Sequence, residues 1–289
     1  MMENIQVPIP KGLKMKHHLE KALKIIYVTI IVAMLYLPVI FIMIESFNSN
    51  KATYEFGSFT FEWYGKMFKN KELLQAIYVT FSITLLSTLI STILGTIFAI
   101  GINSLSKKRS QMLITLNNIP ILNADIVSAI FLFIIFKTIG SLLGIAQPLG
   151  YLTLLLSHIF FSLPYVVLSV LPKLREIDDN LFDAALDLGC GPKLALVKVI
   201  VPAIMGGIFS GAVLAFTMSI DDFTISYFVK GSEISNLSTW INTIRTMRGG
   251  KLQVASAFYT LFTFVAFICL VVYNIIVNKR LDKKRKGAN

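Results

Sequence analysis

Three carboxylates stand inside long apolar stretches of this chain, where acidic residues are unusual. Asp221 and Asp222 are adjacent near the end of one such stretch, and Asp125 lies about midway through another. An Asp at the centre of a membrane helix costs roughly 2.5–3.5 kcal/mol on insertion scales, so it usually faces water or a partner. Carboxylates in this setting can attract a cation that crosses the membrane. We therefore take these three residues as candidates for a substrate path.

Each of these acids also has a structural interpretation. Asp125 either lines a path or hydrogen-bonds Asn residues within a helix bundle. Asp221 and Asp222 point about 100° apart on a helix, so they cannot face one groove equally. We expect one to line the path while the other caps a helix or pairs at an interface, and a structural role for both stays open. Nearby Phe223 and Tyr227 either stack against an alkylammonium chain through cation–π attraction or simply pack.

A second constellation lies in a polar connection, residues 172–202, between two apolar stretches. It reads Asp183-Ala184-Ala185, three residues, Gly189, nine residues, then Val199-Ile200-Val201-Pro202. Asp183 near a helix start favours the positive end of the helix dipole, and alanine is a strong helix former. Gly189 supplies a stop, and Pro192 suits the first position of a following helix. The pattern predicts a short helix, a bend and a second helix that runs into the next apolar stretch.

The elements that position these residues are apolar helices. Hydrophobic residues make up 55% of the 289 residues, which excludes a soluble globular domain. A helix needs roughly 20 apolar residues to cross about 30 Å of hydrocarbon. Runs of that length occur at residues 25–46, 76–102, 112–136, 149–171, 203–228 and 252–277. We predict an all-α polytopic membrane protein with six transmembrane helices in one membrane domain, 25–277, flanked by a basic arm, 1–24, and a basic tail, 278–289.

Lys and Arg predict the orientation of this domain. With the N-terminus inside, 18 of the 27 basic residues fall on the cytosolic side. The positive-inside rule therefore places both termini and the 172–202 connection in the cytosol. The net charge of +11 is explained by this topology and by attraction to anionic membrane lipid, so we expect no nucleic-acid partner.

The other polar residues in or beside the apolar runs favour structural roles. His158 lies inside the fourth apolar run, where a hydrogen-bonded structural role is favoured over a role as ligand. No metal-ligand spacing links it to the other His residues, so no metal site is predicted. Glu45, at the outer end of the first run, is expected to be solvated. Cys190 and Cys269 fall in the cytosolic connection and the last run, so they cannot pair.

The 172–202 connection resembles the coupling loop of binding-protein-dependent ABC importer permeases, although the family's usual first residue is Glu where this chain has Asp183. The stretches 157–167, 216–223 and 61–64 are similar to permeases of spermidine/putrescine importers, in particular their C-type subunit. The resemblance covers roughly residues 25–277. It departs at the third run, where the family commonly has Pro directly before the acid. Here Ala124 precedes Asp125, and Pro120 would move any kink about one turn earlier.

The resemblance implies the type I ABC importer permease (MetI-like) fold in a bacterial inner membrane. It implies a core of two six-span permeases, the second a homologue or another copy, with an ATP-binding subunit dimer and an extracytoplasmic polyamine-binding protein. The residues that would couple to the ATPase are Asp183, Ala184, Ala185, Gly189 and Pro202. The sequence has no Gly-x4-Gly-Lys-Ser/Thr phosphate loop. We therefore expect a transporter subunit rather than an enzyme, with ATP bound by the partner ATPase and no cofactor in this chain.

Two alternatives stay open at this point. The same architecture could carry another solute, such as a metal cation, an oxyanion or an amino acid. An anion path would need Arg or Lys within the spans, and Lys137 is the candidate there. A stand-alone channel or secondary carrier is the other alternative, which the coupling pattern disfavours.

Overall fold

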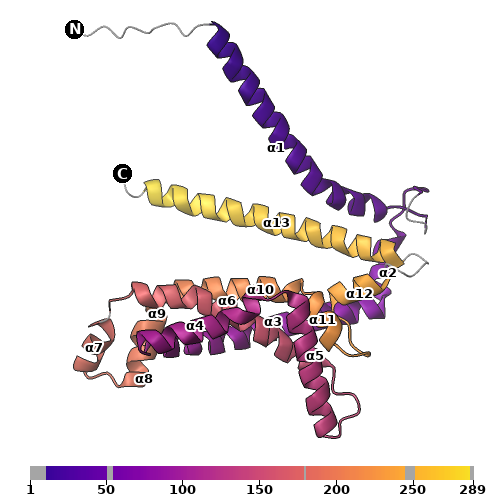
Figure 1. The fold of residues 1–289 in the computed structure, drawn as a ribbon. Coiled ribbons are helices and arrows are strands. Elements are labelled where there is room, and N and C mark those ends of the chain that lie inside the picture. Colours follow the sequence, from indigo (N-terminus) through magenta and orange to yellow (C-terminus); the bar gives the residue numbers. More distant parts are fainter. Residues whose placement is uncertain (1–10, 51–54, 179, 245–250, 287–289) are drawn as a thin grey trace, which may run out of the picture. The chain divides into compact units, whose positions relative to one another are not determined.

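The structure is a computed structural model that describes residues 11–50, 55–178, 180–244 and 251–286. The outermost parts of the predicted arm and tail, 1–10 and 287–289, lie outside these residues. Helices run throughout the described part of the chain (Figure 1). In order they are α1 (Lys11–Glu45), α2 (Glu62–Lys69), α3 (Lys71–Asn103), α4 (Lys107–Leu122), α5 (Asp125–Leu142), α6 (Tyr151–Glu176), α7 (Asn180–Asp187), α8 (Pro192–Ala195), the π-helix η1 (Leu196–Ile200), α9 (Val201–Ala203), α10 (Met205–Ile220), α11 (Thr224–Val229), α12 (Leu237–Ile244) and α13 (Lys251–Lys286).

The all-α membrane architecture is confirmed. Within the described residues, 5 helices are long and apolar enough to cross a membrane, and there are 6 if one bent pair counts as a single span. The five are 20–45 of α1, α3, α5, α6 and 251–279 of α13. The bent pair joins 192–203 to α10. The predicted first, second, fourth and last runs therefore each correspond to one long helix.

The third predicted run is not a single helix. α4 continues through Pro120 to Leu122, and α5 begins at Asp125, so the interruption falls at Asn123 and Ala124 rather than at the proline. The backbone of Asn123 is extended, with φ −78° and ψ 148°. Pro120 lacks the N–H that would bond to the preceding turn, which weakens the last turn of α4 without ending it at once. Only α5 is long enough to be a candidate span here.

The fifth predicted run is interrupted as well. The second helix of the 172–202 connection does not run straight into the span, because the chain bends by 72° between Ala203 and Met205. At the other end α10 stops at Ile220, and the short helix α11 follows after residues 221–223. The predicted run 203–228 thus contains one long helix, a break and a short helix.

The chain forms two compact units, residues 1–69 with 247–289 and residues 70–246. In the first unit, the expectation that Glu45 is solvated was wrong, because its residue is only 6% exposed. The Asn48 amide donates to the Glu45 carboxylate at 3.4 Å, and the Trp63 indole N–H donates to the Asn48 carbonyl at 2.6 Å. Asn48, in the loop after α1, therefore bonds Glu45 where that residue is buried.

The second unit is built on α3, α6 and α10, which pack side by side (Figure 1). Small residues allow the close approach that membrane helices use in place of a hydrophobic driving force. A Cβ added to Gly95 of α3 would lie 2.8 Å from the Val166 side chain of α6, and one added to Gly211 of α10 would lie 3.1 Å from the Val166 Cα. Around this contact lies an aliphatic core that includes Val170 and Ile204. This three-helix core supports the interrupted helices.

Candidate functional site

Asp222 stabilises the break between α10 and α11. Its carboxylate accepts hydrogen bonds from the backbone N–H groups of Ile225, at 3.2 Å, and Ser226, at 2.8 Å. The Ser226 hydroxyl donates to the same carboxylate at 2.8 Å. An Asp side chain that satisfies backbone donors in this way competes with continuous helix and favours a new helix start. This explains why the predicted run is interrupted at this pair of acids.

Asp221 is placed differently from its neighbour. Its residue is exposed, whereas the Asp222 side chain is only 9% exposed. Within the described residues, the Asp221 carboxylate makes no hydrogen bond or ion pair; only its carbonyl is used, as an acceptor from the Ser238 hydroxyl at 3.4 Å. The two adjacent acids therefore have separate environments, one bound into the helix break and one open.

A cavity of about 240 Å3 lies where the two interrupted helices meet. It is bordered by the α4–α5 break, by α6 and by the α10–α11 break. Its lining consists of Pro120, Asp125, Phe161, Tyr165, Met218, Asp221, Asp222, Phe223, Thr224 and Ile225. Irregular backbone at membrane depth is tolerated where it is buried in protein or faces a water-filled cavity, and both breaks border this cavity.

The cavity is acidic. Three carboxylates line it, those of Asp125, Asp221 and Asp222, and no Lys or Arg is among its lining residues. Asp125 is exposed at the start of α5 and, like Asp221, has no hydrogen-bonded or ion-paired partner in the part of the chain that the structure describes. Asp125 and Asp221 come from different breaks, 96 positions apart in the sequence, so only the fold brings them together.

Aromatic side chains add a second component to this cavity. Phe161 and Tyr165, one turn apart on α6, both line it, and Phe223 of the break does so too. Tyr227 does not line the cavity; its ring is tilted against that of Phe223, with centroids 5.5 Å apart. Sequence reasoning missed Phe161 and Tyr165. The available signal was their spacing of four, which places both on one face of a helix.

The basic residues near this region are directed elsewhere. The Lys230 ammonium donates to the carbonyl groups of Gly231, at 3.3 Å, and Ile234, at 3.1 Å. Partial burial lowers the pKa of this ammonium from its ordinary value. Lys137, the candidate for an anion path, is exposed on α5 and does not line the cavity. The charges at the cavity favour a cation.

The 172–202 connection forms the predicted helix, bend and second helix. α7 contains Asp183, Ala184 and Ala185 and ends at Asp187, two residues before Gly189, whose φ is +84°. The Cys190 N–H bonds to the Ala185 carbonyl at 3.1 Å, and the Gly189 N–H bonds to the Leu186 carbonyl at 2.9 Å. These two bonds form a Schellman motif, which requires the left-handed backbone that glycine adopts most readily.

α7 has one face toward the protein and one toward its surroundings. Phe182 packs against the aliphatic core of the three-helix frame, and Ala185 is buried. Asp183 and Ala184 are exposed, and the Leu188 residue is 86% exposed. Pro202 lies in α9, next to the 72° bend that leads into α10. The connection therefore presents exposed side chains, among them Leu188, on and beside an element that also contacts the core.

Relatives of known name align with most of this chain. The family described as binding-protein-dependent transport system inner membrane component matches residues 91–286. The spermidine/putrescine transport system permease protein PotC of Escherichia coli (strain K12) is 31% identical over 254 residues, covering 88% of this chain and 93% of that protein. The putrescine transport system permease protein PotI of the same organism is 30% identical over 204 residues, covering 70% and 73%.

Solved structures share the fold. One chain in the crystal structure of a bacterial ABC transporter for import of the acidic polysaccharide alginate superposes with a TM-score of 0.65 at 17% identity, covering 94% of this chain and 99% of that one. A second structure, of a bacterial alginate ABC transporter in complex with a pentasaccharide-bound periplasmic protein, gives a TM-score of 0.64 at 16% identity, covering 91% and 94%. Identities this low speak for the architecture alone.

Proposed function

We propose, from the premise that this chain belongs to the family of binding-protein-dependent transport system inner membrane components, that its substrates are polyamines. The chain is an ABC importer permease, and its relatives PotC and PotI are named for spermidine and putrescine transport. The observation that carries the substrate class is the acidic cavity at the meeting point of the two helix breaks. Transporters commonly bind substrates between discontinuous membrane helices.

The chemistry of the cavity suits a flexible alkylammonium chain. Asp125 and Asp221 supply two carboxylates without protein partners in the described residues, and Phe161, Tyr165 and Phe223 supply apolar and aromatic surface. Ammonium groups bind both carboxylates and aromatic faces, so a chain with alternating charges and methylenes matches both components. At about 240 Å3 the cavity lies below the roughly 300–1,000 Å3 typical of drug-sized ligands. It would accept one end of a polyamine rather than a saccharide.

The proposed transporter contains more than this chain. A pair of ATP-binding subunits would dock on the outward face of α7. These subunits, rather than this chain, would bind ATP. A second permease would complete the path, and an extracytoplasmic binding protein would deliver the polyamine. Asp183, Ala184, Ala185, Gly189 and Pro202 are proposed as the coupling residues, supported by the exposed Leu188 directly after α7 and by the contact of α7 with the core.

Uptake by the assembled transporter tests the substrate class. The transporter would be reconstituted in proteoliposomes with its binding protein, and ATP-dependent uptake of labelled spermidine, putrescine, butylamine and an alginate oligosaccharide would be compared. We expect uptake of the two polyamines, with butylamine below about a tenth of their rate because it lacks the second charge, a loss of about 1.4 kcal/mol. Import of another solute without polyamine uptake would overturn the proposal.

The proposed orientation has its own test at Cys190. This thiol is partly exposed in the bend after α7, so it should react with a membrane-impermeant maleimide only after cells are opened. The variant background Cys269→Ser removes the other thiol. As an outside control, Ser232→Cys in a chain without Cys190 and Cys269 should label in sealed cells, because residue 232 is exposed in the connection after α11. Rapid labelling of Cys190 in sealed cells would invert the topology.

A further inference from the structure

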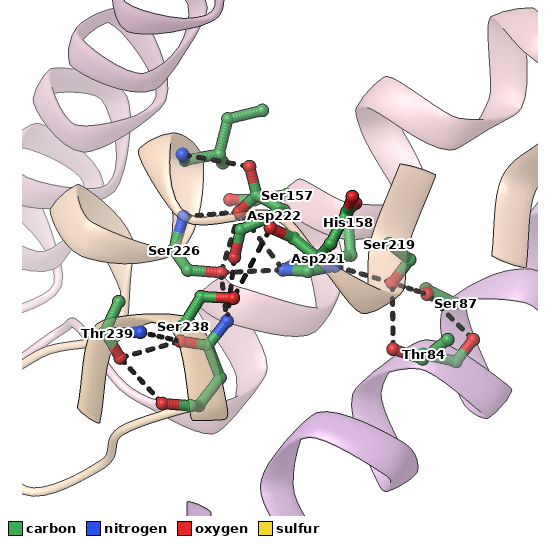
Figure 2. A network of polar contacts seen from close by, with 12 residues as sticks. Thr84, Ser87, Ser157, His158, Ser219, Asp221, Asp222, Ser226, Ser238 and Thr239 are labelled. Carbon is green, nitrogen blue, oxygen red and sulfur yellow. Dashed lines mark hydrogen bonds and ion pairs between the residues drawn. The ribbon is translucent and has the colours of Figure 1, made fainter. Parts of the chain in front are cut away.

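We infer that His158 is a positioning residue that clamps the two halves of the interrupted helix α10–α11 and so fixes the direction of Asp221. The inference rests on the proposed function of the cavity. The His158 residue is 1% exposed and comes from α6. Its Nδ1 lies 2.7 Å from the Ser219 hydroxyl, before the break, and its Nε2 lies 3.0 Å from the Ser226 hydroxyl, after it. Figure 2 shows the imidazole between these two serines.

The surrounding hydrogen bonds assign the proton on this imidazole. The single hydroxyl proton of Ser226 goes to the Asp222 carboxylate, so Ser226 Oγ can only accept from His158 Nε2. Nε2 therefore carries the proton, and Nδ1 is the acceptor in a neutral ring. The Ser219 hydroxyl lies 2.7 Å from Nδ1 and also contacts two hydroxyl groups of α3, that of Ser87 at 3.0 Å and that of Thr84 at 3.5 Å.

The network continues on the far side of the break. The Asn236 amide donates to the Ser226 hydroxyl at 2.9 Å and to the Asp222 carbonyl at 3.0 Å. Asn236 in turn accepts from the Thr239 hydroxyl of α12 at 2.6 Å. The clamp thus joins α3, α6, α10, α11 and α12 through one connected set of hydrogen bonds (Figure 2).

The direction of the Asp221 side chain within the described residues depends on how the helix break is held. Its carboxylate has no hydrogen-bonded partner there, so its direction follows from the backbone of residues 221–223. That backbone can close into continuous helix or shift unless its two ends are held. Asp222, Asn236 and Ser238 hold the break from the α11 side. In the described residues His158 is the side chain that bonds both ends, through Ser219 and Ser226. A histidine that only packs would stabilise the fold without fixing the direction of the Asp221 carboxylate in the cavity.

The number of ATP molecules hydrolysed per polyamine imported distinguishes a positioning role of His158 from a purely structural one. The transporter would be reconstituted with its binding protein, and both rates would be measured per assembled complex. His158→Leu keeps an apolar side chain but removes both hydrogen bonds, while the coupling loop is untouched. We expect at least about a tenfold rise in ATP per polyamine, equivalent to about 1.4 kcal/mol. A loss of folding alone would lower the amount of complex and leave this ratio unchanged.

Two further variants make the test specific. His158→Gln retains a donor and an acceptor, and it should return the ratio to within about threefold of the parental value, since both serines can again be bonded. Ser162→Ala is the matched control, because Ser162 is buried one turn away on α6 and its hydroxyl has no partner in the described residues. It should leave the ratio unchanged.

A parental ratio in assembled His158→Leu would overturn the clamp. If that variant does not assemble, Ser219→Ala and Ser226→Ala each remove one arm of the clamp, and parental ratios in both would overturn it equally. The ratio is measured with whichever solute the parental transporter imports, spermidine and putrescine first. A different substrate would therefore contradict the proposed function while the role of His158 is still decided.

Discussion

Gly189→Asp should leave the transporter assembled in the membrane while abolishing substrate-stimulated ATP hydrolysis. The residue lies at the end of α7, whose outward face combines Leu188, 86% exposed, with Asp183 and Ala184. An exposed leucine at this position is a natural contact for a partner surface. A new charge beside it would have to be desolvated when the ATPase docks, which opposes binding without touching the membrane spans.

The fold should tolerate this substitution. A Cβ added at Gly189 meets no atom within 4 Å, so no steric clash arises within the chain. Its φ of +84° is unfavourable for a side chain and costs about 1–2 kcal/mol, although Asp is among the residues that adopt such values most often. That strain is local to the Schellman motif. The effect on coupling should therefore greatly exceed the effect on stability.

A control with the same backbone strain separates the two effects. Gly144, in the connection after α5, has φ +70° and likewise has no atom within 4 Å of an added Cβ. Gly144→Asp should match Gly189→Asp in the amount of assembled complex yet keep ATP hydrolysis that responds to the loaded binding protein. ATPase rates of purified complexes, with and without loaded binding protein, provide the measurement. Normal stimulation in Gly189→Asp would contradict the assignment of α7 as the coupling element.

The sequence predicted the long helices well because their signal is compositional. Runs such as 76–102 and 252–277 exceed the length needed to cross a bilayer, and each corresponds to one helix. The interruptions were harder to predict, because they depend on competition for backbone hydrogen bonds. Pro120 suggested a kink, but α4 extends past it and breaks at Asn123. Asp222 breaks the fifth run through bonds to Ile225 and Ser226 that apolar length does not reveal.

The candidate site was predicted in part for a similar reason. Asp125, Asp221, Asp222 and Phe223 could be chosen because acids and their neighbours are conspicuous in apolar runs, and all four line the cavity. Their convergence could not be predicted, since it depends on two helix breaks meeting. Whether they conduct substrate stays a prediction. Tyr165 went unnoticed because an aromatic residue in a membrane helix usually packs, and only the geometry of α6 directs it to the cavity.

The second large effect is expected at Asp221. Asp221→Asn keeps the size of the side chain and removes one negative charge from a group without a hydrogen-bonded partner in the described residues, so the fold should be unaffected. Polyamine transport should fall at least about tenfold, equivalent to about 1.4 kcal/mol of lost interaction with the cation. Asp125 would still supply a carboxylate, so some polyamine transport should remain. Uptake per assembled complex, measured with the binding protein present, gives the comparison.

Asp222→Asn should behave differently because its carboxylate is bound to the protein. The new amide group would present a donor to the Ser226 N–H or the Ile225 N–H, and leaving such buried donors unsatisfied costs about 1–3 kcal/mol. We therefore expect a lower yield of assembled complex, with a smaller loss of uptake per complex than in Asp221→Asn. Glu233→Gln removes a charge from the exposed connection after α11 and should change neither quantity.

If Asp221→Asn and Asp222→Asn both assemble normally and import polyamine at the parental rate, the pair is purely structural. The substrate would then have to be recognised elsewhere on the path, because Asp125 alone cannot supply two carboxylates for a cation with two charged ends.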